Sequence, residues 1–324
     1  MAGQPAIRTA GLRKAFGDQQ VLDGIDLEVT PGTVFALLGP NGAGKTTTVH
    51  ILSTLIRADG GEITVAGHDP ARDPDAVRAA IGVTGQFAAV DNLLTGRENL
   101  RLMADLHHLG RDTGRRRIEE LIERFDLGEF IGKRGAQLSG GMRRRLDLAM
   151  GLVGRPRIVF LDEPTAGLDP RSRREMWRVI RELVADGVTI FLTTQYLEEA
   201  DELADSVAVL DHGVLVGQGT PDELKRLVSG GHIRLRLADA VSLGRAGELF
   251  ADATADADAL TLQVPGDGGV RALRALLDRL DAAGIEVEDL SVHTPDLDDV
   301  FFALTGRTEV TTSETTTNEK ETVR

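Results

Sequence analysis

Residues 39–47, which read GPNGAGKTT, combine glycines, a lysine and two threonines at a spacing that suits phosphate binding. Two glycines flank four residues and are followed by Lys and Thr, which is the phosphate-loop pattern. The run follows the apolar stretch 34–38 and opens a helix predicted from about Lys45, as the pattern requires. Glycines allow backbone N–H groups to curl around phosphate oxygens, and a helix start adds a favourable dipole.

From this loop we expect Lys45 to reach the β- and γ-phosphates of a nucleoside triphosphate and Thr46 to ligate Mg²⁺. An ordinary glycine-rich loop is the weaker interpretation, because the flanking strand and helix are both predicted. The loop alone does not separate ATPases from kinases or GTPases. The residues expected to hold nucleotide here are Gly39, Pro40, Asn41, Gly42, Ala43, Gly44, Lys45, Thr46 and Thr47.

Two carboxylates end a second apolar run, 158–164, which reads IVFLDEP. Four apolar residues predict a buried strand, and Asp162 and Glu163 stand at its C-terminal end, where α/β sheets bind ligands. We expect Asp162 to hold Mg²⁺, directly or through water, and Glu163 to polarise the attacking water. Two solvated acids at a strand end are the alternative, which the nearby phosphate loop disfavours.

A third motif, LSGGM at 138–142, precedes a helix predicted from about Met142. Ser139 is a good N-cap, and two glycines again free backbone N–H groups at a helix start. A capped helix with a flexible entry is the plain interpretation. The segment also resembles the signature of ATP-binding cassette (ABC) ATPases, found elsewhere as Leu-Ser-Gly-Gly-Gln.

The ordered motifs make residues 6 to about 226 similar to an ABC cassette, and this resemblance implies further roles. Phe16 stands where an aromatic ring stacks on adenine, although a core phenylalanine is the alternative. Gln86 stands where a glutamine joins the γ-phosphate and the metal to a membrane partner. The segment GLDP at 167–170 resembles the loop that crosses a dimer interface.

By the same resemblance, two copies pair head to tail and share each ATP. The phosphate loop of one copy then faces the signature residues Ser139, Gly140 and Gly141 of the other. A monomeric P-loop ATPase is the alternative to this homodimer. The segments 142–149 and 294–301 resemble those of daunorubicin-resistance drug-efflux ATPases, which implies export of a drug or antibiotic-like compound.

The sequence departs from the family pattern at two positions. Met142 replaces the usual glutamine of the signature, and Gln195 stands where a switch histidine is expected. Glutamine can donate a hydrogen bond to the γ-phosphate, but it carries no proton near neutral pH. We therefore assign Gln195 an orienting role and expect Glu163, Lys45 and Gln195 to form the catalytic set.

The composition limits the partners of the chain. A net charge of -14 over 324 residues argues against a nucleic-acid binder, and the absence of cysteine excludes a disulfide framework. The longest apolar runs have the length of buried strands and are shorter than a membrane span. A membrane role must therefore come from docking. The resemblance to ABC ATPases implies that the chain docks at the cytoplasmic face of the cell membrane, on a separate permease that itself binds the transported compound. The arginine runs 115–117 and 143–145 are expected on solvated helix faces, and contact with an anionic partner or a phospholipid surface is the alternative.

Alternation of apolar strands and helices predicts an α/β fold with a parallel sheet covered on both faces. We expect an ABC cassette over 6–228, with antiparallel strands near its start and a helical subdomain over about 96–155. A small accessory α+β domain should follow over 232–306, with strands at 233–237, 260–264 and 285–292 and a helix over 270–283. The polar tail 307–324 is expected to be disordered.

Two other functions compete with a transporter subunit. Soluble ABC-type ATPases act in translation or DNA maintenance, but they usually carry two cassettes or a long coiled coil. This chain has one cassette and no heptad run. A P-loop kinase or GTPase is disfavoured by the signature-like segment.

Overall fold

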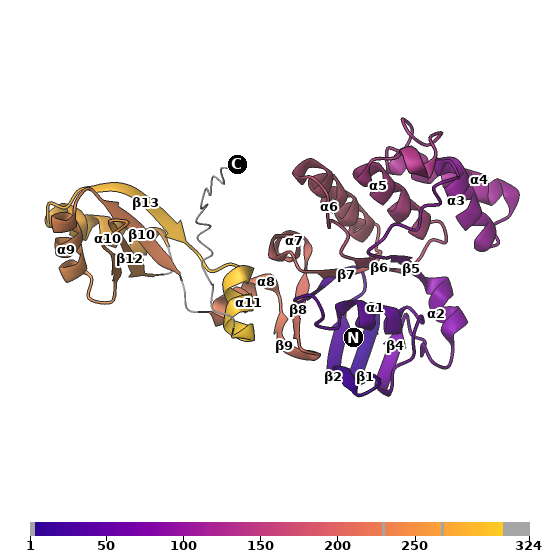
Figure 1. Cartoon of the computed structure of the whole chain (residues 1–324), viewed down its shortest axis with the longest axis horizontal. Helices are drawn as coiled ribbons and strands as arrows, with labels where there is room; N and C mark the ends of the chain where they lie inside the picture. The colour runs from indigo at the N-terminus through magenta and orange to yellow at the C-terminus, as the bar shows by residue number, and fades with distance from the viewer. Residues whose placement is uncertain (1–3, 229–230, 267–268, 307–324) are drawn as a thin grey trace, which may run out of the picture. The chain divides into compact units, whose positions relative to one another are not determined.

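The computed structural model describes residues 4–228, 231–266 and 269–306, and the predicted tail 307–324 lies outside them. The chain divides into two compact units, Met1–Arg226 and Leu227–Arg324, which we describe separately. Figure 1 labels the elements of both. Among the described residues, no helix combines the length and apolar character needed to span a membrane.

A six-stranded sheet forms the centre of the first unit, in the order β5-β6-β7-β3-β8-β9. All neighbours are parallel except β8 and β9. Every position of β3, β6 and β7 is buried, as the continuous apolar runs predict. The strands are β3 (Val34–Leu38), β5 (Ile81–Thr84), β6 (Ile158–Asp162), β7 (Thr189–Thr194), β8 (Ser206–Asp211) and β9 (Val214–Gly219).

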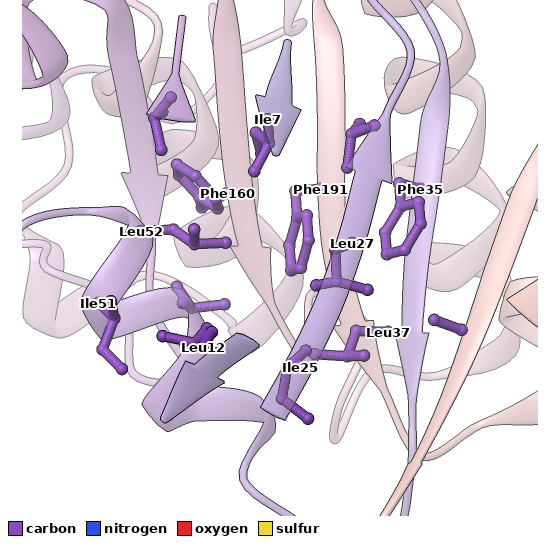
Figure 2. Close-up of a cluster of buried hydrophobic side chains, with 14 of the residues drawn as sticks. Ile7, Leu12, Ile25, Leu27, Phe35, Leu37, Ile51, Leu52, Phe160 and Phe191 are labelled. Atoms are coloured by element: carbon purple, nitrogen blue, oxygen red, sulfur yellow. The ribbon is translucent and has the colours of Figure 1, made fainter. Parts of the chain in front are cut away.

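A three-stranded antiparallel sheet, β2-β1-β4, covers one side of the central sheet. It contains β1 (Ile7–Phe16), β2 (Gln19–Val29) and β4 (Gly60–Val65), in the region where antiparallel strands are predicted. Figure 2 shows the core between the two sheets, where Phe35, Phe160 and Phe191 meet aliphatic side chains of the antiparallel strands. The rings of Phe35 and Phe191 stack with centroids 5.3 Å apart. This core fixes the ends of β3, β6 and β7, which carry the predicted site.

Helices flank the central sheet. α6 begins after Asp169, whose side chain accepts hydrogen bonds from the N–H groups of Arg171 and Ser172, and Pro170 is its first residue. Its apolar face, which includes Trp177 and Ile180, is buried. The helices here are α1 (Lys45–Leu52), α2 (Pro74–Ala80), α6 (Pro170–Ala185), α7 (Leu197–Leu203) and α8 (Pro221–Leu227).

The region predicted as a helical subdomain holds α3 (Gly96–Leu106), α4 (Arg111–Arg124), a 3₁₀ turn (Gly135–Gln137) and α5 (Gly140–Gly151). α5 begins two residues before the predicted start, because Ser139 accepts a hydrogen bond from the N–H of Met142 and so places both signature glycines in the first turn.

The prediction that both arginine runs lie on solvated helix faces is wrong for one residue in each run. Arg117 is buried and donates to the Leu152 carbonyl at 2.7 Å. Arg144 is also buried and donates to backbone carbonyls. Arg115 and Arg116 are exposed as predicted, so a run of like charges does not share one environment along a helix.

The second unit contains an antiparallel sheet in the order β11-β12-β10-β13. Along β10 the residues Ile233, Leu235 and Leu237 are buried while the arginines between them are exposed, which is the alternation of a one-sided sheet. The elements are β10 (His232–Leu237), α9 (Ala240–Leu249), β11 (Thr254–Asp256), β12 (Thr261–Pro265), α10 (Val270–Ala282), β13 (Val287–His293) and α11 (Leu297–Thr305). The helices α9 and α11 were not predicted from the sequence.

Candidate nucleotide-binding site

The phosphate loop joins β3 to α1 and is folded around the ammonium group of Lys45. Lys45 Nζ donates to the Gly39 carbonyl at 2.7 Å and to the Pro40 carbonyl at 3.1 Å. The side chain is only 5% exposed, and burial lowers its pKa, while the carboxylates of Glu163 and Asp162 oppose that shift. The loop carbonyls therefore hold the ammonium group of Lys45 in position. Phosphate oxygens of a bound nucleotide can replace these carbonyls as its hydrogen-bond acceptors.

Two positions of this loop require glycine. A Cβ atom on Gly39 would lie 2.3 Å from the Leu210 carbonyl oxygen. Gly44 has φ +111°, and a Cβ atom there would lie 2.6 Å from Leu22 Cδ2. Close packing against β2 and β8 thus fixes the loop in a shape whose backbone N–H groups suit an anion.

Two oxygen-bearing side chains meet beside the loop. Thr46 Oγ1 lies 3.0 Å from Asp162 Oδ2, and Thr193 donates to the other oxygen of the same carboxylate. Asp162 is buried at the end of β6. A hydroxyl and a carboxylate are donors that Mg²⁺ prefers, so Thr46 and Asp162 fit that ion.

Glu163 follows β6 with a left-handed backbone, φ +49°, and its side chain is buried. Its N–H donates to the Thr193 carbonyl at 3.0 Å. Its carboxylate lies 3.8 Å from Lys45 Nζ, and its other oxygen accepts from Gln86 Nε2 at 3.4 Å. Gln86, predicted near the metal, is thus brought against Glu163.

Two predicted residues have exposed side chains. Phe16 ends β1 and is 52% exposed, with Lys14 Nζ 5.2 Å from its ring centroid, so the alternative of a core phenylalanine is wrong. Gln195 directly follows β7, and its side chain is exposed. Both positions leave the side chain able to meet a ligand.

The signature segment, residues 138–142, lies at the start of α5 and packs against α6. Ser139 caps α5, and a Cβ atom on Gly140 would meet open space. Gly141 faces α6, because a Cβ atom there would lie 2.9 Å from Ser172 Oγ. Within the described residues, no hydrogen bond joins this segment to the phosphate loop, and the Ser139 hydroxyl accepts from the N–H of Met142. The chain brings together its loop, Gln86, Asp162 and Glu163, and presents the signature separately.

Sequence reasoning missed two residues that contact this cluster. Thr193 binds both Asp162 and the N–H of Glu163, and its place at the end of β7 was an available signal. Arg144 donates to the Asp162 and Pro164 carbonyls, on either side of Glu163. Its position within a run of three arginines gave no sign of burial.

Comparison with known proteins agrees with this geometry. Residues 22–166 match the family described as ABC transporter, and residues 219–305 match the one described as ATP-binding protein DrrA1-3-like, C-terminal domain. A solved structure described as the ATP binding subunit of an ABC transporter superposes with a TM-score of 0.63 at 29% identity, over 68% of this chain and 92% of that one.

Two relatives match over nearly the full chain. Daunorubicin resistance ATP-binding protein DrrA3 of Streptomyces coeruleorubidus is 51% identical, over 93% of this chain and 96% of that protein. Daunorubicin/doxorubicin resistance ATP-binding protein DrrA of Streptomyces peucetius is 47% identical, over 93% and 92%. Because both alignments run through the phosphate loop and through the C-terminal unit, this chain belongs to the ATP-binding proteins of ABC transporters, in the daunorubicin-resistance group.

Proposed function

We propose that this ABC-type ATPase binds Mg-ATP at the ends of β3, β6 and β7, hydrolyses it, and energises export through a separate membrane protein. The observation that carries the proposal is the convergence of Lys45, Thr46, Asp162 and Glu163, with the ammonium group of Lys45 3.8 Å from the carboxylate of Glu163. Such a cluster has a cation for phosphates, oxygen donors for a metal and a base for water.

Each residue of the cluster then has a role. Lys45 contacts the β- and γ-phosphates, and Thr46 and Asp162 hold Mg²⁺, with Gln86 reaching the same ion. When bound, that ion neutralises charge on the phosphate oxygens. Glu163 orients the attacking water and accepts its proton, while Gln195 orients the γ-phosphate. Phe16 stacks on adenine, which its exposure permits.

The signature completes the site from a second copy. Ser139, Gly140 and Gly141 form the start of α5, whose free N–H groups suit the γ-phosphate. They have separate surroundings in their own chain, so a head-to-tail homodimer supplies them in trans. We assign this role to residues 6–228 and regard 232–306 as an accessory domain.

Several large apolar side chains of the first unit are exposed and suit contact with a membrane partner. Phe87 and Leu93 in the segment after β5 are 87% and 80% exposed, and Leu102 and Leu106 of α3 are also exposed. We infer that a permease docks here at the cytoplasmic face of the cell membrane. The similarity to daunorubicin-resistance proteins favours a drug or antibiotic-like cargo, bound by that partner and not by this chain.

The test is Glu163→Gln. Loss of the carboxylate should leave ATP binding intact and reduce hydrolysis by at least about 100-fold, because an amide cannot accept the proton of water. Steady-state phosphate release measures the rate, and a sizing column with ATP should show a trapped dimer. Glu182→Gln, at a half-buried position of α6 outside the candidate site, is the matched control and should hydrolyse ATP like the wild type. Unchanged hydrolysis in Glu163→Gln would falsify the assigned base.

A further inference from the structure

Arg144 of α5 uses all three guanidinium nitrogens in the interior of the first unit. Nε donates to the Pro164 carbonyl at 2.9 Å, Nη2 to the Asp162 carbonyl at 3.1 Å and Nη1 to the Gly85 carbonyl at 2.6 Å. The side chain is 6% exposed. A buried arginine with this many backbone acceptors fixes the segments that carry them, because the guanidinium group is planar and its N–H donors have a rigid geometry.

The three carbonyl acceptors belong to neighbours of Glu163 and Gln86, whose side chains contact each other in the candidate site. Asp162 and Pro164 stand on either side of Glu163, and Gly85 directly precedes Gln86. Glu163 itself has a left-handed backbone, and its N–H is held by Thr193. Arg144 therefore fixes the peptide group directly before Glu163, through the Asp162 carbonyl, and the one directly after Pro164, through the Pro164 carbonyl. Glu163 lies between them in a conformation that needs such support.

A second side chain of α5 holds the other end of the Gln86 segment. Asp147, one turn after Arg144, accepts the N–H of Ala89 at 2.8 Å through Oδ1. Its Oδ2 lies 3.4 Å from Arg144 Nη1. The segment 85–89 is thus tied to α5 at both ends, and the buried guanidinium has a carboxylate partner.

The neighbouring arginines of the same helix do not reach these segments. Arg143 donates to Asn92 Oδ1 at 2.7 Å and to the Gly135 carbonyl at 2.8 Å. Arg145 lies over the ring of Phe130, 5.3 Å from its centroid. Among the three, Arg144 is the residue that links α5 to the end of β6.

We propose that Arg144 is a positioning residue that couples the orientation of the signature helix α5 to the placement of Glu163 and Gln86. It acts through backbone carbonyls and does not contact nucleotide. A rotation of α5, as when its N-terminus engages ATP held by a second copy, then moves the carbonyl groups of Asp162 and Pro164, the residues on either side of Glu163. This inference rests on the proposed function, since it assigns Arg144 a part in the same hydrolysis.

The experiment compares Arg144→Met and Arg144→Lys with the wild type and with Arg143→Met, which removes a neighbouring arginine of equal size. For each protein, ATP turnover is measured at a temperature where circular dichroism shows it to be folded. Affinity is measured separately with trinitrophenyl-ATP. We expect kcat of Arg144→Met to fall at least about 10-fold while the affinity stays within threefold, because the phosphate loop does not touch Arg144.

Arg144→Lys should lose less, since one ammonium group can keep some of the carbonyl bonds. Arg143→Met should turn over like the wild type. If kcat of Arg144→Met stays within twofold, or if its affinity falls in proportion to kcat, the positioning role is wrong. Should Arg144→Met not fold, the same two criteria apply to Arg144→Lys.

The design separates this proposal from the proposed function. If the wild type hydrolyses ATP and Glu163→Gln does not, but both Arg144 variants keep the wild-type rate, only the positioning role fails. A wild-type chain without ATPase activity overturns both proposals.

Discussion

Glu163 has a left-handed backbone conformation, φ +49°, which residues other than glycine rarely adopt. Such a residue costs about 1–3 kcal/mol and persists only where its surroundings enforce it. Here the N–H is held by Thr193, and the flanking carbonyls are held by Arg144. In this conformation the carboxylate lies beside Lys45 and Gln86, and we interpret the backbone strain as the means by which the fold positions the proposed base.

At position 195 a glutamine replaces the histidine of the family pattern, and its side chain is exposed directly after β7. If Gln195 orients the γ-phosphate through one hydrogen bond, Gln195→Ala should slow turnover about 10-fold to 100-fold, which a lost transition-state bond of about 1.4–2.7 kcal/mol would cause. Gln195→His should keep much of the activity, because neutral imidazole also donates. Steady-state ATPase rates at saturating Mg-ATP measure both.

The dependence of rate on pH then distinguishes orientation from proton transfer. The Gln195→His variant should gain a limb near pH 6–7 that the wild type lacks at this position, because imidazole titrates there. Unchanged activity in Gln195→Ala would mean that position 195 takes no part in hydrolysis.

Helix α5 carries ionisable side chains on its buried face. Leu146, Leu148 and Ala149 are buried beside Arg144 and Asp147. Burial raises the pKa of Asp147 to about 6, although the Ala89 N–H and the charge of Arg144 oppose the shift. The contact between Asp147 and the Ala89 N–H, which joins α5 to the segment after β5, therefore changes in strength with pH.

Asp147→Asn tests this attachment through stability. The folded pKa of about 6 lies above the ordinary 3.8, so between these values the folded state binds more protons than the unfolded state. The free energy of unfolding contributed by Asp147 must fall as pH rises through that window, by about 3 kcal/mol at most. Urea unfolding from pH 4.5 to 7.5 should show a flatter fall in Asp147→Asn than in the wild type.

The matched control is Asp126→Asn, at a side chain that is 84% exposed. It should reproduce the pH dependence of the wild type. If Asp147→Asn also reproduces it, the raised pKa of Asp147 is wrong.

For the whole molecule, the separation of the signature from the phosphate loop is the central fact. Ser139 caps α5 in the helical subdomain, while the loop is packed between β2 and β8. Under the proposed function, one chain therefore presents two half-sites, and a head-to-tail pair of chains would complete both. This arrangement predicts complementation between different defective copies.

Ser139→Arg and Lys45→Ala should each be inactive as homodimers, since each breaks both shared sites. Mixed one to one, half of the dimers contain one intact site, so activity should return to about a quarter of the wild type if the sites act independently. Phosphate release across a series of mixing ratios measures this.

Lys45→Ala mixed with Glu163→Gln is the control, because both changes lie in the loop-bearing half and no mixed dimer has an intact site. It should stay inactive at every ratio. If the mixture of Ser139→Arg with Lys45→Ala also shows no ATPase activity, a shared site is contradicted, unless hydrolysis requires two intact sites in one dimer.

Local sequence alone determined the motifs and the fold class. The glycine spacing of 39–47 and the apolar runs before 39 and 162 are patterns of neighbouring residues. The strands β3 and β6 and the start of α1 were therefore predicted correctly. The similarity to ABC ATPases followed from the order of the motifs. The helices α9 and α11 were missed; α9 contains Gly244 and Gly247, which lower helix propensity.

Tertiary structure decided the rest, because burial is set by segments far apart in the sequence. Arg144 contacts carbonyls 59, 18 and 20 residues away, and no local pattern distinguishes it from Arg143. Gln86 meets Glu163 across 77 residues through the pairing of β5 with β6. A sequence names the side chains that can do chemistry, whereas their partners depend on which strands and helices the core brings together.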